Sequence, residues 1–225
     1  MPADLPFAAL LLDFDGTLVD SEVNWMRAEN RLLTEYGVEW NEQRSMEFVG
    51  MALNDVGRAM LAITGATDTD AEGIRDRLIA YAIEDMSEVG VPWQPGAKDL
   101  LTEVRERGVP TALVTGSYME VVKPFLEKLP AGTLDAVVTG DQTERGKPHP
   151  DPYLEAASRL GVDAAACLAV EDSNTGIGAA QAAGCLVIGV PYLVELDDRP
   201  GLVKIPSLAG VTVADLAGIV REHRA

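Results

Sequence analysis

The chain has 225 residues, 47% hydrophobic and 24% charged, a composition typical of a globular protein with one α/β domain or a core plus a small second domain. Its 18 basic and 36 acidic residues give a net charge of −18, which argues against nucleic-acid binding, because a phosphate backbone requires a basic surface. No apolar run approaches the ~20 residues of a membrane span, and the first residues lack the basic region of a secretory signal, so we expect a cytoplasmic protein that binds no membrane.

Six short apolar segments are predicted as buried strands. In chain order they are 8–14, 110–115, 136–139, 166–171, 186–190 and, with the weakest pattern, 211–213. Most are rich in Val, Leu and Ala without polar alternation, as expected of strands covered on both faces. Helical patterns alternate with them over 97–107, 119–129, 152–160 and 176–183. This alternation predicts an α/β fold with a doubly wound, mostly parallel Rossmann-like sheet.

The segment between the first two predicted strands has a different pattern. Apolar residues recur there at helical spacing, first from Trp25 to Tyr36 and later from Ile74 to Ala82, and no strand is predicted. We therefore predict an inserted, all-helical cap domain. The predicted domains are a core of residues 1–19 and 94–225 and a cap of residues 20–93. The two linkers that join them are expected to form a hinge.

Polar residues stand at the carboxyl ends of the predicted strands, where an open parallel sheet binds its ligands. They are Asp13 and Asp15 after the first strand, Thr115, Gly116 and Ser117 after the second, Lys147 after the third, and Glu171 and Asp172 at the end of the fourth. Each residue alone has an ordinary interpretation as a turn residue, a helix cap or a surface charge. Their coincidence at one edge of the sheet predicts a functional site.

The residue types at this edge are suited to phosphoryl transfer. Carboxylates gathered at one point repel one another unless a cation lies between them, and their oxygens suit Mg²⁺. An aspartate can attack phosphorus and form an acyl-phosphate that water hydrolyses, while a second carboxyl group moves the protons. Hydroxyl groups, loop amides and an ammonium group can hold the oxygens of the transferred phosphoryl group.

Four segments resemble the four motifs of the haloacid dehalogenase superfamily, in the right order and over nearly the whole chain. They are DFDGTLVDS at 13–21, VTGS at 114–117, GKP at 146–148 and VEDSNTG at 170–176. The run AAQAAG at 179–184 is also typical of the β-phosphoglucomutase-like phosphatase branch. As a set these motifs are highly specific, whereas the first motif alone would be weak.

The resemblance implies catalytic roles for three residues. Asp13 would be the nucleophile, and Asp15 would be the general acid and base. Lys147 would neutralise both the nucleophile and the phosphate. The phosphate would be bound by Thr115, Gly116, Ser117 and Lys147.

The resemblance also implies Mg²⁺ as the cofactor and a function for the cap. The metal would be held by Asp13, by the backbone carbonyl of Asp15, by Asp172, and by Glu171 directly or through water. The cap would close over a small phosphorylated metabolite and exclude bulk water. A loop at 50–55 is the candidate specificity element.

Among the reactions of this superfamily, the sequence favours hydrolysis of a phosphomonoester through an aspartyl-phosphate. Dehalogenases generally lack the second aspartate of the first motif, so Asp15 argues against them. Phosphonate cleavage uses a cap lysine, and residues 21–93 contain none. A sugar phosphomutase resembling β-phosphoglucomutase remains the alternative. However, segment 21–25 lacks the histidine typical of mutases, and segment 50–55 lacks the expected arginine.

A receiver domain that stores phosphate on an aspartate is the non-enzyme alternative. Such domains also gather acidic residues, a hydroxyl group and a lysine at one end of a parallel sheet. They are much shorter and have no large helical insert after the first strand, so the enzyme interpretation fits better. We expect a monomer or a weak homodimer.

Overall fold

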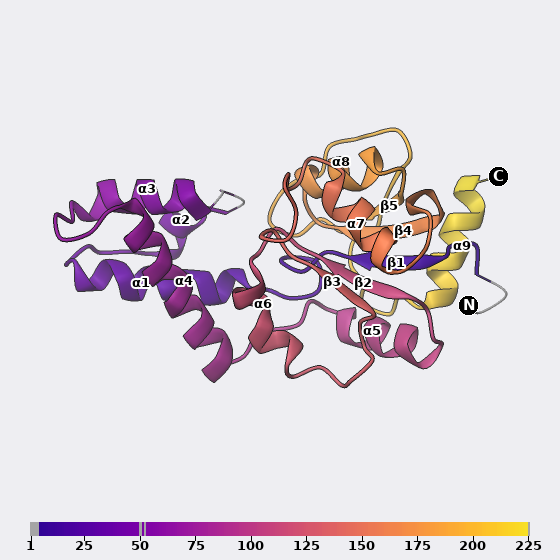
Figure 1. Ribbon diagram of the computed structural model, residues 1–225, viewed down its shortest axis with the longest axis horizontal. Coiled ribbons are helices and arrows are strands. Elements are labelled where there is room, and N and C mark those ends of the chain that lie inside the picture. The colour runs from indigo at the N-terminus through magenta and orange to yellow at the C-terminus, as the bar shows by residue number, and fades with distance from the viewer. Residues whose placement is uncertain (1–4, 50, 52, 225) are drawn as a thin grey trace. The chain divides into compact units, whose positions relative to one another are not determined.

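The computed structural model describes residues 5–49, 51 and 53–224 (Figure 1). The chain forms two compact units. The first contains Met1–Asp20, Pro92–Met119 and Leu129–Ala225, and the second contains Ser21–Val91 and Glu120–Lys128. The interpretation of residues 20–93 as a domain that closes over a substrate stays a prediction.

The first unit is built on a parallel sheet with the strand order β3-β2-β1-β4-β5-β6. Its strands are β1 (Ala9–Leu12), β2 (Thr111–Val114), β3 (Ala136–Val138), β4 (Cys167–Glu171), β5 (Leu186–Gly189) and β6 (Leu202–Lys204). In the register, Leu11 lies between Ala112 of β2 and Ala169 of β4. The order of connection reverses between β1 and β4, so the loops that leave these two strands diverge and open a crevice. The predicted α/β fold with a parallel sheet is confirmed.

Helices cover both faces of this sheet. The helices that follow the insert are α5 (Ala97–Glu106), α6 (Met119–Leu126), α7 (Asp151–Arg159), α8 (Asn174–Ala182) and α9 (Val213–Arg224), with a 3-10 turn, η1 (Ala164–Ala166), before β4. α7 and α8 lie over one face of the sheet, and α5 lies on the opposite side (Figure 1). No helix in the described part of the chain is both long and apolar enough to cross a membrane.

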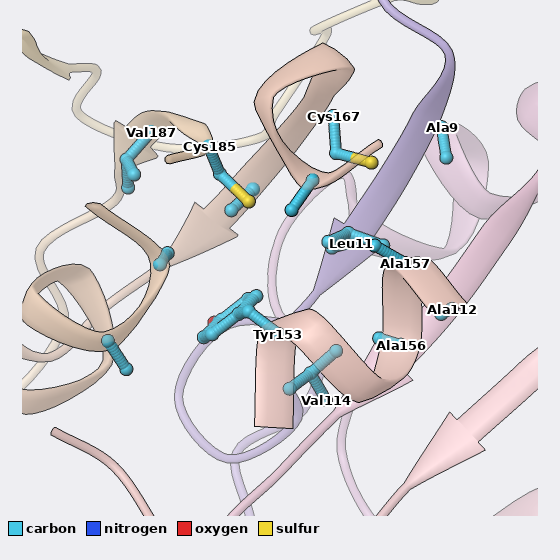
Figure 2. Packing of buried hydrophobic residues seen from close by; sticks show 14 of the residues in the cluster. Ala9, Leu11, Ala112, Val114, Tyr153, Ala156, Ala157, Cys167, Cys185 and Val187 are labelled. Atoms are coloured by element: carbon cyan, nitrogen blue, oxygen red, sulfur yellow. The ribbon is translucent and has the colours of Figure 1, made fainter. Parts of the chain in front are cut away.

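The face under α7 and α8 is packed with small and branched side chains (Figure 2). Ala9 and Leu11 of β1 point into this cluster, whereas Leu10 and Leu12 point to the other face and are equally buried. Both faces are apolar because both are covered by helices, which explains the absence of polar alternation in the sequence. Tyr153 of α7 is fully buried in the same cluster.

The prediction of a sixth strand over 211–213 is wrong, because β6 lies at Leu202–Lys204 and α9 begins at Val213. Thr212 and Asp215 cap this helix reciprocally. Asp215 N donates to Thr212 Oγ1 at 3.2 Å, and Thr212 N donates to Asp215 Oδ2 at 2.9 Å. Val213 N donates to Glu103 Oε2 of α5 at 3.0 Å. The two valines at 211 and 213 suggest a strand, but the capping hydrogen bonds between Thr212 and Asp215 start a helix at this point instead.

Helices are the regular secondary structure of the second unit in its described residues, and the insert between β1 and α5 contains no strand in the part that the structure describes, as predicted. Its helices are α1 (Glu22–Glu35), α2 (Glu42–Ser45), α3 (Leu53–Thr64) and α4 (Ala71–Glu88), together with α6 from Glu120 onward. Helices α1, α3 and α4 enclose a core that includes Leu32, Met60, Ile74 and Leu78. Gly50 and Ala52, two residues of the predicted specificity loop, lie outside the described residues.

The two predicted linkers run side by side within the first unit. Val19 and Trp93 form an antiparallel bridge. Asp20 N donates to Pro92 O at 2.8 Å, and Gln94 N donates to Leu18 O at 2.9 Å. The chain therefore leaves for the insert and returns from it through one hydrogen-bonded pair of backbones.

Candidate active site

The predicted site residues gather at the crevice between β1 and β4. Asp13 follows β1, Thr115 follows β2, and Lys147 lies in the loop after β3. Glu171 is the last residue of β4, and Asp172 follows it. All five belong to the first unit, so their arrangement does not depend on the helical insert.

Lys147 is the centre of a buried ion-pair network. Its Nζ donates to Asp13 Oδ1 and to Glu171 Oε1, each at 2.5 Å, and to Val114 O at 3.0 Å. Burial lowers the pKa of Lys147, but the charges of Asp13 and Glu171 outweigh it and raise the pKa above its ordinary value. The side chain is therefore a fixed cation whose three donors are all engaged.

Three carboxylates offer a site for a metal ion. Ligand atoms of Asp13, Glu171 and Asp172 all lie within 4.8 Å of one another. Burial, followed by the charge of Glu171, raises the pKa of Asp13 to about 7. Burial, followed by the charge of Asp13, raises the pKa of Asp172 to about 9. Because one ammonium faces three carboxylates, the cluster carries excess negative charge that a divalent cation would neutralise.

The turn after the first aspartates favours glycine. Gly16 has a φ of +83°, in the region that L side chains rarely adopt. A Cβ on Gly16 would also lie 2.0 Å from Asp172 Oδ2. Both the backbone conformation and the close approach of Asp172 therefore favour glycine over any residue with a side chain here.

Asp15 contacts the loop after β2. Its Oδ2 accepts hydrogen bonds from Ser117 Oγ at 2.7 Å and from Thr115 Oγ1 at 3.2 Å. Ser117 N donates in turn to Thr115 Oγ1 at 2.9 Å, across Gly116. The two hydroxyls expected to bind phosphate thus hold Asp15, and the Asp15 carboxylate does not belong to the three-carboxylate cluster.

The loops after β2 and β3 are tied together by residues that the sequence analysis did not identify. Gly140 N donates to Ser117 O at 2.9 Å. Asp141 Oδ1 accepts from Met119 N at 3.0 Å, at the start of α6, and from Thr139 Oγ1 at 2.7 Å. Nothing in the sequence pairs these loops, because the contacts depend on how β2 and β3 lie in the sheet.

Two further residues that the sequence analysis missed contact Glu171. Tyr153 OH donates to Glu171 Oε1 at 2.8 Å, and Ser173 Oγ donates to Glu171 Oε2 at 2.9 Å. For Tyr153, the sequence does contain a feature that could have indicated this contact. The residue lies on the apolar face of a helix, where a buried hydroxyl group requires a partner.

Known proteins resemble this chain in sequence and in fold. The family model of haloacid dehalogenase-like hydrolases matches residues 10–190. Hexitol phosphatase B of Escherichia coli K12 is 31% identical over 216 residues, covering 93% of this chain and 96% of that protein. Validoxylamine A 7'-phosphate phosphatase of Streptomyces hygroscopicus subsp. limoneus is 31% identical over 220 residues, covering 96% and 98%.

Solved structures share the fold. A variant of CbbY from Rhodobacter sphaeroides, in complex with xylulose-(1,5)bisphosphate, has a TM-score of 0.81 at 25% identity and covers 93% of this chain and 99% of its own. A β-phosphoglucomutase from Clostridium difficile has a TM-score of 0.76 at 17% identity, covering 97% and 99%.

The chain belongs to the haloacid dehalogenase-like hydrolase family. Within this family it is a phosphomonoester hydrolase of the β-phosphoglucomutase-like branch.

Proposed function

We propose that the chain is a Mg²⁺-dependent phosphatase that hydrolyses a phosphorylated sugar or polyol through an aspartyl-phosphate on Asp13. The observation that carries this proposal is the position of Asp13. Its Oδ1 lies 2.5 Å from Lys147 Nζ, beside the carboxylates of Glu171 and Asp172. A nucleophilic carboxylate beside a fixed cation is what phosphoryl transfer to an aspartate requires.

In the first step, a carboxylate oxygen of Asp13 attacks phosphorus, and the bond between phosphorus and the ester oxygen breaks. Lys147 stays bound to Asp13 and stabilises the negative charge of the phosphoryl oxygens during transfer. In the second step, water attacks the same phosphorus, the bond between phosphorus and the Asp13 oxygen breaks, and inorganic phosphate leaves as the Asp13 carboxylate is regenerated.

Asp15 is the proposed proton carrier. In its protonated form it gives a proton to the oxygen of the departing alcohol, and as a carboxylate it accepts a proton from the attacking water. The hydroxyls of Thr115 and Ser117 donate to Asp15 Oδ2 at 3.2 and 2.7 Å and hold this side chain in place.

The excess negative charge of the cluster fits a divalent cation. Mg²⁺ would be held by Asp13, Asp172 and the backbone carbonyl of Asp15, and would neutralise the oxygens of the phosphate. Glu171 would contribute its negative charge to the site rather than a ligand atom. Both of its oxygens already accept hydrogen bonds from Lys147, Tyr153 and Ser173.

The substrate class is inferred from the relatives. Their printed names refer to hexitol phosphates, a validoxylamine 7'-phosphate and xylulose-(1,5)bisphosphate, all polyhydroxylated molecules. The mutase alternative shares the fold, and a mutase needs a sugar bisphosphate to prime its aspartate.

The deciding experiment is an assay of the purified chain on p-nitrophenyl phosphate and on hexitol, hexose and pentose phosphates, with MgCl₂ or with chelator. We expect Mg²⁺-dependent phosphate release that Asp13→Asn abolishes and that Asp99→Asn, an exposed change on α5, leaves unaltered. Stoichiometric phosphate labelling without turnover would indicate a receiver. Interconversion of glucose 1-phosphate and glucose 6-phosphate that requires the bisphosphate would indicate a mutase.

A further inference from the structure

Tyr153 is a fully buried residue of α7 that lies beside the charged groups of the site. Its hydroxyl group donates to Glu171 Oε1 at 2.8 Å, and Lys147 Nζ lies 5.4 Å from the centre of its ring. Burial raises the pKa of Tyr153 well above its ordinary value, and the charges of Glu171 and Asp13 raise it further. The phenol is therefore protonated at neutral pH and acts there as a hydrogen-bond donor.

Glu171 has no acceptor position to spare. Oε1 accepts from Lys147 Nζ at 2.5 Å and from Tyr153 OH at 2.8 Å. Oε2 accepts from Ser173 Oγ at 2.9 Å and from Ser173 N at 3.2 Å. A Cβ on Gly176 would lie 1.7 Å from Oε1, so the carboxylate occupies the space that a side chain at this position of α8 would fill. A carboxylate offers about four acceptor positions, and here all of them have protein donors.

We propose that Tyr153 is a positioning residue for phosphoryl transfer, which holds Glu171 so that Glu171 in turn holds Lys147 on Asp13. Tyr153 and Lys147 donate to the same oxygen, Glu171 Oε1. The Tyr153 hydroxyl therefore orients the carboxylate and reduces the electrostatic attraction between that oxygen and the Lys147 ammonium. Without the hydroxyl, the carboxylate would draw Lys147 toward itself and away from Asp13. This role rests on the proposed function of Asp13 and Lys147.

The first test is Tyr153→Phe, which keeps the buried ring and removes only the donor. We expect kcat to fall by about 10- to 100-fold, the usual effect of losing a partner that orients a site residue. KM should change little, because the hydroxyl group does not touch the substrate. Tyr36→Phe is the matched control, since it removes a tyrosine hydroxyl that accepts from Arg77 in the second unit, and it should retain full kcat.

A double-mutant cycle tells positioning from general packing. If Tyr153 acts through Glu171, then Tyr153→Phe should cause no further loss of kcat in a Glu171→Gln background. Losses that multiply, with each variant reducing kcat by the same factor in both backgrounds, would overturn the proposal.

A measurement without substrate separates this proposal from the proposed function. Acetic anhydride labelling, followed by mass spectrometry, measures the reactivity of Lys147 against that of Lys128, whose Nζ donates to Met86 O and Ser87 O in the second unit. In Tyr153→Phe we expect slower labelling of Lys147 alone, because a closer Glu171 carboxylate stabilises the ammonium and only the neutral amine reacts. Unchanged labelling, or an equal change at both lysines, would overturn the role of Tyr153. Absence of turnover in the unaltered chain would instead overturn the proposed function.

Discussion

Burial and the charge of Glu171 raise the pKa of Asp13 to about 7, while the ammonium of Lys147 opposes them. The nucleophile is therefore a carboxylate that its surroundings only partly stabilise. Lys147 Nζ, at 2.5 Å from Asp13 Oδ1, is the positive charge that offsets these effects and favours the ionised form of Asp13. The ion pair serves both to keep Asp13 ionised and to receive the charge of the phosphoryl group.

Replacement of Lys147 should disable the site. In Lys147→Met the carboxylates of Asp13 and Glu171 lose their shared cation in a buried environment. We expect kcat to fall by at least about 100-fold, as when one donor is removed from a preorganised charge-stabilising site. Steady-state kinetics with saturating Mg²⁺ measures the loss. Lys123→Met, an exposed change on α6, is the control, and near-normal activity of Lys147→Met would contradict the assignment.

Replacement of Gly16 should damage the site for two reasons that a control can separate. Gly16→Ala places an alanine at an unfavourable φ, which should lower the free energy of unfolding by about 1–3 kcal/mol. It also places a Cβ 2.0 Å from Asp172 Oδ2, so the Asp172 side chain must move. Gly201→Ala has a similar φ of +74° with nothing near the added Cβ. Urea unfolding and phosphatase assays should show lost stability in both variants and lost activity only in Gly16→Ala. Equal activity in the two variants would contradict the collision.

At the scale of elements, much of the sheet could be predicted from the sequence. Strands buried on both faces leave continuous apolar runs, so β1, β2, β3, β4 and β5 all lie within their predicted segments. β6 was missed because Leu202–Lys204 is only three residues long, and its two apolar residues are followed directly by the exposed Lys204. The start of α9 was recognisable only through the Thr212 and Asp215 pair.

The candidate site was predictable in composition but not in its internal contacts. The order of strands brings Asp13, Lys147 and Glu171 together, since the carboxyl ends of parallel strands meet at one edge. The hydrogen bonds of Asp15 to Thr115 and Ser117, and of Tyr153 to Glu171, depend on side-chain rotamers and on the packing of α7. Neither follows from spacing along the chain.

The capping pair of α9 gives a prediction at this scale. Thr212→Ala should lower the free energy of unfolding by about 1 kcal/mol, because it removes the hydroxyl that accepts from Asp215 N. Thr212→Ser should retain most of the stability. Urea denaturation measures both, and phosphatase activity should be unchanged in both, since the cap lies away from the carboxyl edge of the sheet.

At the scale of the whole molecule, the carboxylate cluster links stability to pH and to metal. The pKa values of Asp13 and Asp172 rise on folding from 3.8 to about 7 and about 9, so the folded chain binds more protons than the unfolded chain between these limits. Their contribution to stability is full below pH 3.8 and is lost as the pH rises through about 7 and about 9.

The metal-free chain should therefore melt at a lower temperature at pH 9 than at pH 6, and Mg²⁺ should raise the melting temperature more at the higher pH. Thermal unfolding in chelator and in MgCl₂ across this range measures both effects. Asp172→Asn controls for the general effect of a net charge of −18, and its metal-free melting temperature should depend less on pH. Identical pH profiles for the two proteins would contradict the linkage.

The paired linkers at Val19 and Trp93 have a consequence for how such a chain can change during evolution. The chain enters the insert at Val19 and leaves it at Trp93, and these two residues pair in one antiparallel β-bridge. For the core, the insert Ser21–Val91 therefore joins two adjacent backbones, as a turn does. The entropy of closing a loop grows only slowly with its length. A change in the length of the insert should therefore cost the core little loop-closure entropy, and the part of the later chain that such a change would affect is Glu120–Lys128, which belongs to the same unit as the insert.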